Sequence, residues 1–375
     1  MKLRKNFSSQ RMKLNEVVSY IESEFPKALQ ESYDNSGLIA GDRNQEVSGA
    51  LLALDITEEV LKEASTKGLN LVISHHPAVF QNIKSFTGAN TTERILIYAL
   101  QHKIALFSAH TNLDNHKNGL NEKLASVLGL ENSAVLSPME KMLQKLVTFV
   151  PVNEAEKVRS AIFAAGAGHI GEYDLCSYNL EGTGTFRGSE ISKPFAGEKG
   201  KLTREAEVRI ETIMPVYIRD KVVRALLEAH PYEEPAYDIY PLDNKWNQNG
   251  AGRIGTLKKP LSEMHFLELV KKSLNAKVLR HSSLTGKSIK KVAVCGGSGS
   301  FLIKQAIASG ADAFVSSDFK YHQFYEGGRG VLLIDAGHFE TEQFALQLFY
   351  DVLIKKIPNF AVHFSELAIN PVNYY

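Results

Sequence analysis

Residues 49–77 read GALLALDITEEVLKEASTKGLNLVISHHP, and their pattern decides the fold class. GALLALDI is an almost uninterrupted apolar run, which is typical of a strand buried on both faces of a parallel sheet. TEEVLKEASTKG places acidic residues early and a glycine last, as helices often do. LNLVIS is a second buried strand. A strand, a helix and a strand in immediate succession predict a parallel α/β unit.

The same alternation continues along the chain and returns near its C-terminus. The next three segments predict a helix, a strand and a helix, TTERILIYALQH (91–102), IALFSAHTNLD (104–114) and GLNEKLASVLG (119–129). The later segments are KKVAVCGG, FLIKQAIASG, ADAFVSS, GVLLIDAG and a long amphipathic stretch over 339–356. Both ends of the chain therefore predict one α/β architecture built on a parallel sheet.

The middle of the chain contains an internal repeat. PVNEAEKVRSAIFAAGAGHIGEYD, which begins at Pro151, aligns without a gap with PVYIRDKVVRALLEAHPYEEPAYD, which begins at Pro215, at an offset of 64 residues. Each copy predicts a strand, a helix and a strand, and two such units in tandem are the recipe for a ferredoxin-like α+β domain. Between the copies, FRGSEISKPFAGEKGKL is polar and Gly-rich and predicts a loop.

The repeat divides the chain into two predicted domains, as its 375 residues also suggest. We expect a discontinuous α/β domain over residues 1–136 and 250–375, and an inserted ferredoxin-like domain over 137–249. DNKWNQNGAG, rich in Asn and Gly, is the expected return linker.

Composition excludes several classes of protein. Basic and acidic side chains balance, 43 against 42, so a dedicated nucleic-acid binder is not indicated. Cys176 and Cys295 stand alone, which predicts neither a disulfide framework nor a Cys-rich zinc cluster. The basic start MKLRKNFSSQRMK lacks the apolar stretch of a secretory signal, and no later run is apolar enough to span a bilayer. We therefore expect a soluble cytoplasmic protein without membrane partners, with Met12 as an alternative start.

Candidate metal ligands follow two neighbouring predicted strands. His75 and His76 end the strand LNLVIS before Pro77, and ligands of open parallel sheets gather beyond the carboxyl ends of the strands. The next strand offers His110 and Asp114, whose imidazole and carboxylate suit ions such as Zn²⁺, Mn²⁺ or Fe²⁺. We take Asp114 as a ligand. His110 is expected either to orient a ligand from outside the coordination shell or to be a hydrogen-bonded histidine packed at the strand end.

A third strand, GVLLIDA, precedes GHFETE. If a helix begins there, His338 and Glu342 project from one face because they are four residues apart. Asp335, inside the strand, is expected to be structural or to cap the helix. His75, His76, Asp114, His338 and Glu342 are too many ligands for one tetrahedral zinc with an open position, but they suit two ions about 3.5–4 Å apart. We expect zinc, with Mn, Fe or Ni as alternatives, and hydrolytic chemistry driven by metal-activated water.

Two weaker motifs stand near other predicted strand ends. In CGGSGS, Gly297 and Gly299 are followed by Leu302 where the third glycine of a dinucleotide fingerprint would stand, so a tight strand-to-helix turn is favoured and no organic cofactor is expected. In SSDFKYHQF, the polar residues Asp318, Lys320 and His322 either line the pocket or form a plain turn.

The motifs SHHP, HTNLD, GGSG, DFKYH and DAGHFETE together resemble the Nif-three-like family, known by its YbgI and YqfO members as GTP cyclohydrolase I type 2 homologs. DNSGLIAG and HPYEEPAYDIY extend the resemblance over nearly the whole chain after Met12. It implies that His75, His76, Asp114, His338 and Glu342 bind a pair of metal ions. It also implies a PII/CutA-like, trimer-forming insert and a homohexameric toroid whose metal sites face an inner cavity.

The leading functional hypothesis is a dinuclear-metal hydrolase of the GTP cyclohydrolase I type 2 homolog kind, acting on a nucleotide or a related small molecule. Lys320 or Arg253 would be the nearest source of positive charge for phosphates. The alternative is a metal-stabilised hexameric assembly or regulatory module that binds a protein or nucleic-acid partner without catalysis. In a third hypothesis the insert binds a small molecule through the stretch from His230 to Glu234, although an oligomerisation module is favoured there.

Overall fold

The structure is a computed structural model, and it describes residues 11–327, 330–367 and 370–375. It has a mixed α/β fold with several sheets, as predicted. The chain divides into two compact units, Met1–Ser137 with Gln248–Tyr375, and Pro138–Asn247. Among the described residues, no helix combines the length and the apolar character needed to cross a bilayer.

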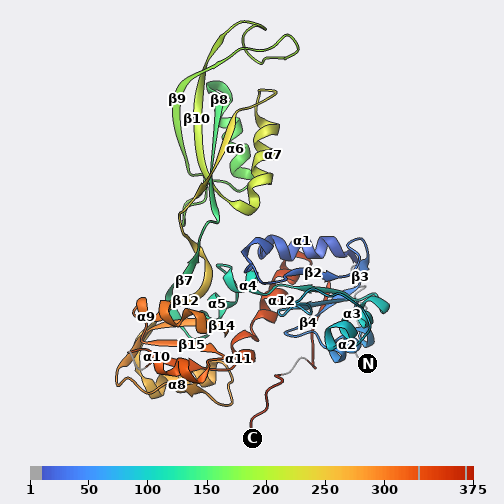
Figure 1. Ribbon diagram of the computed structural model, residues 1–375, viewed down its shortest axis with the longest axis vertical. Coiled ribbons are helices and arrows are strands. Elements are labelled where there is room, and N and C mark those ends of the chain that lie inside the picture. The colour runs from blue at the N-terminus through green and yellow to red at the C-terminus, as the bar shows by residue number, and fades with distance from the viewer. Residues whose placement is uncertain (1–10, 328–329, 368–369) are drawn as a thin grey trace, which may run out of the picture. The chain divides into compact units, whose positions relative to one another are not determined.

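The first unit contains a five-stranded sheet in the order β17-β4-β5-β6-β2 (Figure 1). Its strands are β2 (Gly37–Ala40), β4 (Gly49–Ala53), β5 (Leu71–Ser74), β6 (Ala105–Ser108) and β17 (Ala361–Phe364). β17, β4, β5 and β6 run parallel, and only β2 pairs antiparallel at the edge. The quoted stretch GALLALDI thus forms a central strand, as its apolar run predicts.

Helices cover both faces of this sheet because successive side chains of a strand point to opposite sides. These helices are α1 (Leu14–Glu24), α2 (Glu58–Thr66), α3 (Thr91–Gln101) and α12 (Ala345–Lys356). Leu52 packs with α1 and α12, whereas Leu51 packs with α2 and α3. The Thr57 side chain accepts a hydrogen bond from the Val60 amide at 3.2 Å, which fixes the start of α2.

A second sheet of the same unit has the order β13-β16-β15-β14-β12-β7. Its strands are β7 (Leu130–Met139), β12 (Trp246–Ser262), β13 (Arg280–His281), β14 (Ser288–Ser298), β15 (Ala313–Ser317) and β16 (Leu332–Asp335). β14, β15 and β16 are parallel, whereas β12 and β13 pair antiparallel with their neighbours. Its helices are α5 (Leu120–Val127), α8 (Glu263–Ser273), α9 (Ile303–Ala308) and α10 (Phe324–Gly327).

Three segments differ in detail from the sequence prediction. DNKWNQNGAG contains the point at which the chain returns to the first unit, Gln248, but most of it is the beginning of β12 rather than a loop. β6 ends at Ser108, and HTNLD instead forms the short helix α4 (Thr111–Asn115), because the buried carboxylate of Asp34 accepts a hydrogen bond from the Thr111 amide at 3.0 Å and turns the chain. The amphipathic stretch after GVLLIDA is two helices, α11 (His338–Glu342) and α12.

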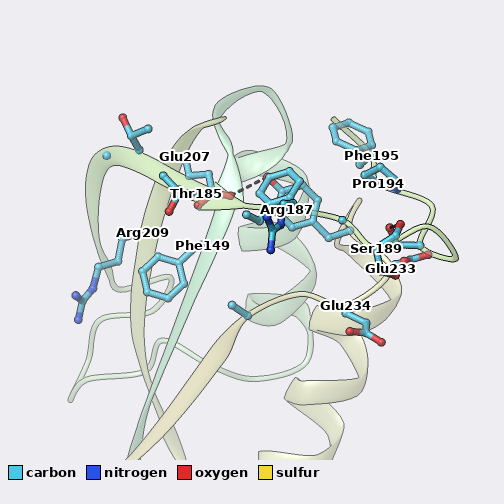
Figure 2. A pocket seen from close by; sticks show the side chains of 18 of the residues that line it. Phe149, Thr185, Arg187, Ser189, Pro194, Phe195, Glu207, Arg209, Glu233 and Glu234 are labelled. Atoms are coloured by element: carbon cyan, nitrogen blue, oxygen red, sulfur yellow. Dashed lines mark hydrogen bonds between the residues drawn. The ribbon is translucent and has the colours of Figure 1, made fainter. Parts of the chain in front are cut away.

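The second unit is a four-stranded antiparallel sheet in the order β11-β8-β10-β9, the arrangement of a ferredoxin-like fold. Its elements are β8 (Leu143–Pro151), α6 (Ala155–Ala164), β9 (Ser177–Phe186), β10 (Thr203–Pro215), α7 (Arg219–Ala229) and β11 (Tyr237–Leu242). Val208 and Ile210 of β10 pack with both helices. Glu207 and Arg209 alternate with them on the other face of the sheet (Figure 2).

The two copies of the sequence repeat have the same order of secondary structure. Pro151 and Pro215 each end a strand, and each is followed by a single 3-10 turn and a helix. The remaining elements are β1 (Met12–Lys13), which pairs with β3 (Glu46–Val47), and the 3-10 turns η1 (Lys27–Leu29), η2 (Val152–Glu154), η3 (Val216–Ile218), η4 (Ser300–Leu302) and η5 (Tyr321–Gln323).

Candidate metal centre

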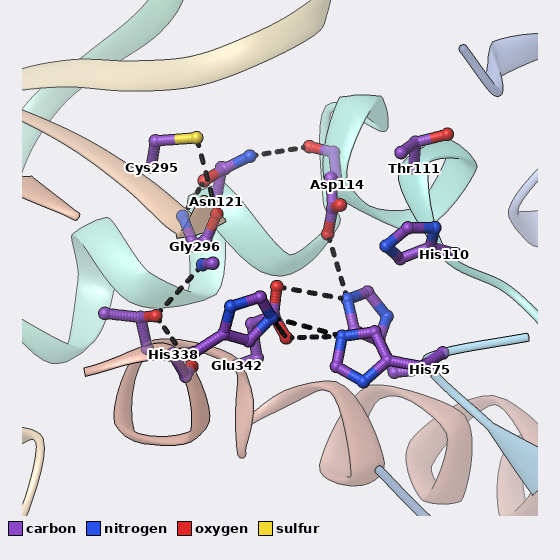
Figure 3. A network of polar contacts seen from close by, with 12 residues as sticks. His75, His110, Thr111, Asp114, Asn121, Cys295, Gly296, His338 and Glu342 are labelled. Atoms are coloured by element: carbon purple, nitrogen blue, oxygen red, sulfur yellow. Dashed lines mark hydrogen bonds and ion pairs between the residues drawn. The ribbon is translucent and has the colours of Figure 1, made fainter. Parts of the chain in front are cut away.

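Strand ends from both sheets of the first unit bring the predicted ligands together (Figure 3). His75 and His76 directly follow β5, and Asp114 lies on α4 just after β6. His338 and Glu342 lie one turn apart on α11, which follows β16 of the other sheet. All five residues therefore reach one cluster, although they come from three separate parts of the chain.

Glu342 stands at the middle of the cluster. Its Oε2 lies 2.9 Å from His76 Nε2 and 3.0 Å from His338 Nε2. Its Oε1 lies 3.7 Å from His75 Nε2, which in turn is 3.5 Å from Asp114 Oδ1. A buried carboxylate therefore faces three imidazoles within the cluster.

Four histidines and Glu342 offer donor atoms in two overlapping groups that could each hold an ion, and the predicted ligand Asp114 belongs to neither group. His76, His338 and Glu342 make one group, and His75, His76 and His110 make the other, with all ligand atoms of a group within 4.8 Å of one another. His110 thus offers a nitrogen to the cluster on the same terms as the predicted ligands.

Two buried polar atoms of the cluster fit a cation. His75 Nε2 and Asp114 Oδ1 are shielded from solvent and have no hydrogen-bond partner in the part of the chain that the structure describes. An unsatisfied buried group costs about 1–3 kcal/mol, and coordination of an ion would remove that cost for both atoms. Imidazole nitrogens and carboxylate oxygens are also the donors that first-row divalent ions accept.

Three carboxylates orient the histidines of the site, and of these only Asp318 was a sequence candidate for lining the pocket. Asp55 Oδ1 lies 2.8 Å from His76 Nδ1, and Asp318 Oδ2 lies 2.7 Å from His338 Nδ1. Asp34 Oδ1 lies 2.8 Å from His110 Nδ1. A carboxylate on one ring nitrogen fixes the ring and directs the other nitrogen at a metal.

His75 is oriented differently, since its Nδ1 lies 3.0 Å from the carbonyl oxygen of Ala109. Asp55 was missed, although it shares with Asp318 a signal in the sequence. Asp55 closely follows β4 and Asp318 directly follows β15, so both are acids at the carboxyl end of a parallel strand, as the ligands are.

The charges of the cluster shift the pKa of each member. Burial would lower the pKa of His76, but hydrogen bonds to Asp55 and Glu342 outweigh it and raise the pKa to about 10. Burial also opposes the charge of His338, yet contact with Glu342 and Asp318 raises its pKa to about 9. For His75, which is fully buried, burial prevails and lowers the pKa.

The two carboxyl groups of the cluster shift in opposite directions. Burial, then the charge of Glu342, raises the pKa of Asp114 well above its usual range. Burial would do the same to Glu342, but the surrounding histidines, His75 first, hold its pKa well below that range. One carboxylate is therefore stabilised as an anion by the cluster itself, while the other gains most from a cation placed beside it.

Gly297 makes room for the cluster. It has a φ of +58°, and a Cβ atom there would lie 2.0 Å from Glu342 Oε1 and 3.3 Å from His338 Nε2. The turn in CGGSGS is the tight turn that we expected. The absence of a side chain at this turn also leaves space for Glu342, which the sequence did not reveal.

The remaining sequence candidates do not join the cluster. Asp335 is structural, since it accepts a hydrogen bond from the Phe319 amide at 3.0 Å and pairs with an arginine. Arg253 is buried against Glu122, with Nε 3.3 Å from the carboxylate. Lys320 and His322 are exposed, and neither lines the pockets beside the cluster. Neither predicted source of positive charge thus lines the pocket of the cluster.

A pocket of about 640 Å³ opens beside the cluster and is lined in part by His76, His338 and Glu342. Three aromatic side chains with largely exposed rings also line it, Tyr33, Phe80 and Phe301. None of the described residues that line this pocket is Arg or Lys.

Fold and site together define a mixed α/β protein with His-rich clusters that could hold metal ions. The chain belongs to the DUF34/NIF3 family. Its residues 12–371 match the family described as Duf34/NIF3 (NGG1p interacting factor 3), which confirms the resemblance seen in the motifs.

Proteins of similar sequence match most of the chain. A GTP cyclohydrolase 1 type 2 homolog of Halalkalibacterium halodurans is 40% identical over 324 residues, which cover 86% of this chain and 87% of the relative. A protein of the same name from Bacillus subtilis is 38% identical over 326 residues, with coverage of 86% and 87%.

Solved structures show the same fold. The Bacillus cereus protein related to NIF3 superposes with a TM-score of 0.85 at 40% identity, covering 98% of this chain and 100% of that one. Staphylococcus aureus protein SA1388 gives a TM-score of 0.76 at 30% identity, with coverage of 97% and 99%.

Proposed function

We propose that this protein is a dinuclear divalent-metal hydrolase acting on a nucleotide or a related small molecule. The observation that carries the proposal is the Glu342 carboxylate, which faces His75, His76 and His338 within one buried cluster. These residues and Asp114 would hold two ions, zinc by preference, with Mn, Fe or Ni as alternatives. When bound, the ions would supply electrophilic activation of the scissile bond and an activated water as the nucleophile.

The chain itself contributes the orientation of the ligands. Asp55 and Asp318 hold His76 and His338 so that their Nε2 atoms face Glu342. Because His75 is fully buried and tied to a backbone carbonyl, its ring cannot turn away from the cluster. Such fixed ligands are favourable for catalysis because little reorganisation remains for the reaction itself.

The pocket favours a substrate with a planar ring. Tyr33, Phe80 and Phe301 expose aromatic surface at its walls, and rings of this kind stack on heterocyclic bases. Because the described lining residues include no lysine or arginine, the positive charge available to phosphates would come only from the bound ions and the cluster histidines. The aromatic walls therefore favour the base end of a nucleotide, or another heterocycle, as the part of the substrate that packs on them.

Turnover of a panel of nucleotides, nucleosides and free bases by protein loaded with Zn²⁺, Mn²⁺ or Fe²⁺ tests this proposal. We expect activity in the native protein and none in His76→Ala or Glu342→Ala. The exposed His363 and Glu268 lie outside the cluster and its pocket, so His363→Ala and Glu268→Ala control for the loss of each side-chain type. Equal activity in the cluster variants and their controls would remove the proposal.

A second candidate function is a metal-stabilised homohexameric assembly that recruits a protein or nucleic-acid partner without catalysis, with the PII/CutA-like insert making subunit contacts. The observation that favours it is apolar surface on the insert, where Tyr178, Leu180 and Tyr240 are exposed on strands β9 and β11. Exposed apolar patches often mark protein contacts. Hexameric mass and partner capture in the native protein that are both lost in His76→Ala, together with no turnover by native protein, would favour this function.

A further inference from the structure

The insert contains a pocket of its own, of about 750 Å³, which neither the candidate metal centre nor the proposed hydrolysis uses. It is lined only by residues of the second unit, from β9, the loop that follows it, β10 and the segment after α7 (Figure 2). The segment after α7 is the HPYEEP stretch that the sequence singled out as polar enough to bind a ligand.

Glu207 is the buried polar group of this pocket. It lies on β10 with 8% of its surface exposed, and its Oε1 accepts a hydrogen bond from the Tyr232 hydroxyl at 2.7 Å. No residue that the structure describes donates a hydrogen bond to Oε2. The second carboxylate oxygen is therefore available to a donor that enters the pocket.

The strand beside Glu207 is shaped to admit this carboxylate. Gly184 of β9 stands where a Cβ atom would lie 2.1 Å from Glu207 Oε2. Any larger residue at this position would displace the Glu207 carboxylate. Gly184 therefore leaves room for a carboxylate that is unfavourable to bury without a partner.

Aromatic rings form the apolar part of the pocket. The ring centroids of Phe186 and Phe195 lie 5.8 Å and 6.1 Å from that of Tyr232. Phe195 exposes more than half of its surface although it is a large apolar side chain. An apolar body of a ligand would cover these rings, and a cation above them would be attracted to their faces.

The charge of the lining is negative on balance. Its carboxylates are Glu181, Glu207, Glu233 and Glu234, and its cations are Arg187 and Arg209. One of these cations, Arg209, lies 2.8 Å from the carboxylate of Glu211, which Lys145 also contacts at 2.8 Å. A positively charged ligand is thus favoured over an anion.

We propose that the insert binds an organic ammonium compound, whose charged N–H group donates to Glu207 Oε2 and whose apolar body packs on Phe186, Phe195 and Tyr232. An ammonium with an N–H donor satisfies the free carboxylate oxygen, which a quaternary nitrogen cannot do. This site is independent of the proposed hydrolase activity.

Binding of 2-phenylethylamine to the full chain tests the proposal, with 2-phenylethanol as its uncharged analogue of nearly the same shape. At about pH 7.5 the amine is protonated. Because a hydrogen bond to a charged group is worth about 1.5–3 kcal/mol, we expect the amine to bind at least about 10-fold more tightly than the alcohol. Ligand-observed NMR measures both affinities.

Two variants and a control locate the interaction. Glu207→Gln keeps the shape of the side chain and should abolish the preference for the amine, and Gly184→Ala should weaken amine binding about 10-fold by displacing the carboxylate. Glu205→Gln removes the same charge from the same strand but lies outside the pocket lining, so it should change nothing. Circular dichroism checks that each variant is folded.

Equal affinity for the amine and the alcohol, or native amine binding by Glu207→Gln, would overturn the proposal. So would the absence of detectable amine binding at about 10 mM, since a site with this charge and aromatic surface should hold such a small cation at that concentration.

Discussion

Replacing Gly297 with alanine should empty the metal centre without unfolding the protein. A Cβ atom at this position would lie 2.0 Å from Glu342 Oε1, whereas ordinary contact begins at 3.4 Å, so the oxygen would have to move by about 1.4 Å. Ligands must keep their places within about 0.5 Å for tight coordination. We therefore expect Gly297→Ala to weaken metal binding by at least about 100-fold.

A second glycine in the same backbone conformation provides the control. Gly310, which follows α9, has a φ of +69°, but a Cβ atom there would have no neighbour within 4 Å. Both alanine variants incur the left-handed backbone penalty of about 1–2 kcal/mol, so both should lose similar free energy of unfolding for that reason. Only Gly297→Ala should lose its metal.

Elemental analysis of protein purified without added metal, together with titration against a chelating dye, measures occupancy and affinity. Urea denaturation of the two variants measures the shared backbone penalty. Full metal content and native affinity in Gly297→Ala would refute the reasoning, because they would mean that Glu342 is not held where the structure places it or is not a ligand.

Three further predictions concern the surroundings of the cluster and the acid stability of the chain. Asp55→Asn and Asp318→Asn should each weaken metal binding about 10–100-fold, measured by chelator competition, because each leaves a histidine without its orienting anion; native affinity in both would contradict this. His110→Ala should reduce the bound ions from two to one by elemental analysis, and retention of both would restrict His110 to an orienting role. Burial would raise the pKa of Glu63, but hydrogen bonds from Lys67 and Ser365 outweigh it and lower the pKa below its ordinary 4.5, so the stability it contributes is present above that pH and lost as the pH falls through the lowered pKa. Thermal unfolding of Glu63→Gln should therefore depend less on pH below about 4.5 than that of the native protein, and parallel curves would count against it.

Apolar runs predicted the parallel sheets because the central strands of these sheets are buried on both faces. GALLALDI and LNLVIS became neighbouring parallel strands, and the repeat at Pro151 and Pro215 became two equivalent halves of an antiparallel sheet. DNKWNQNGAG contains the return to the first unit, as predicted, but its composition favours a turn, whereas pairing with other strands makes most of it part of β12. Local preference gave way to tertiary hydrogen bonds there.

The ligand cluster was accessible from the sequence because its residues stand at strand ends, where parallel topology brings side chains to one edge. The groups that support it were less accessible. Nothing in a one-dimensional pattern shows that Asp55 faces His76 across neighbouring strands, or that Gly297 is small because Glu342 lies against it. The sequence also does not show that Arg253 forms an ion pair with Glu122, which is distant in sequence.

The origin of the cluster in distant parts of the chain also governs when it can form. His76 and His338 face each other at 3.3 Å, yet 262 residues separate them. At a translation rate of about 5–20 residues per second, the ribosome needs roughly 13–52 s to travel from one to the other. During that interval the nascent chain lacks His338 and Glu342, so the group of candidate ligands that these two residues form with His76 is incomplete. If the cluster binds ions as proposed, it would select them after synthesis, from the metals that the folded protein then encounters.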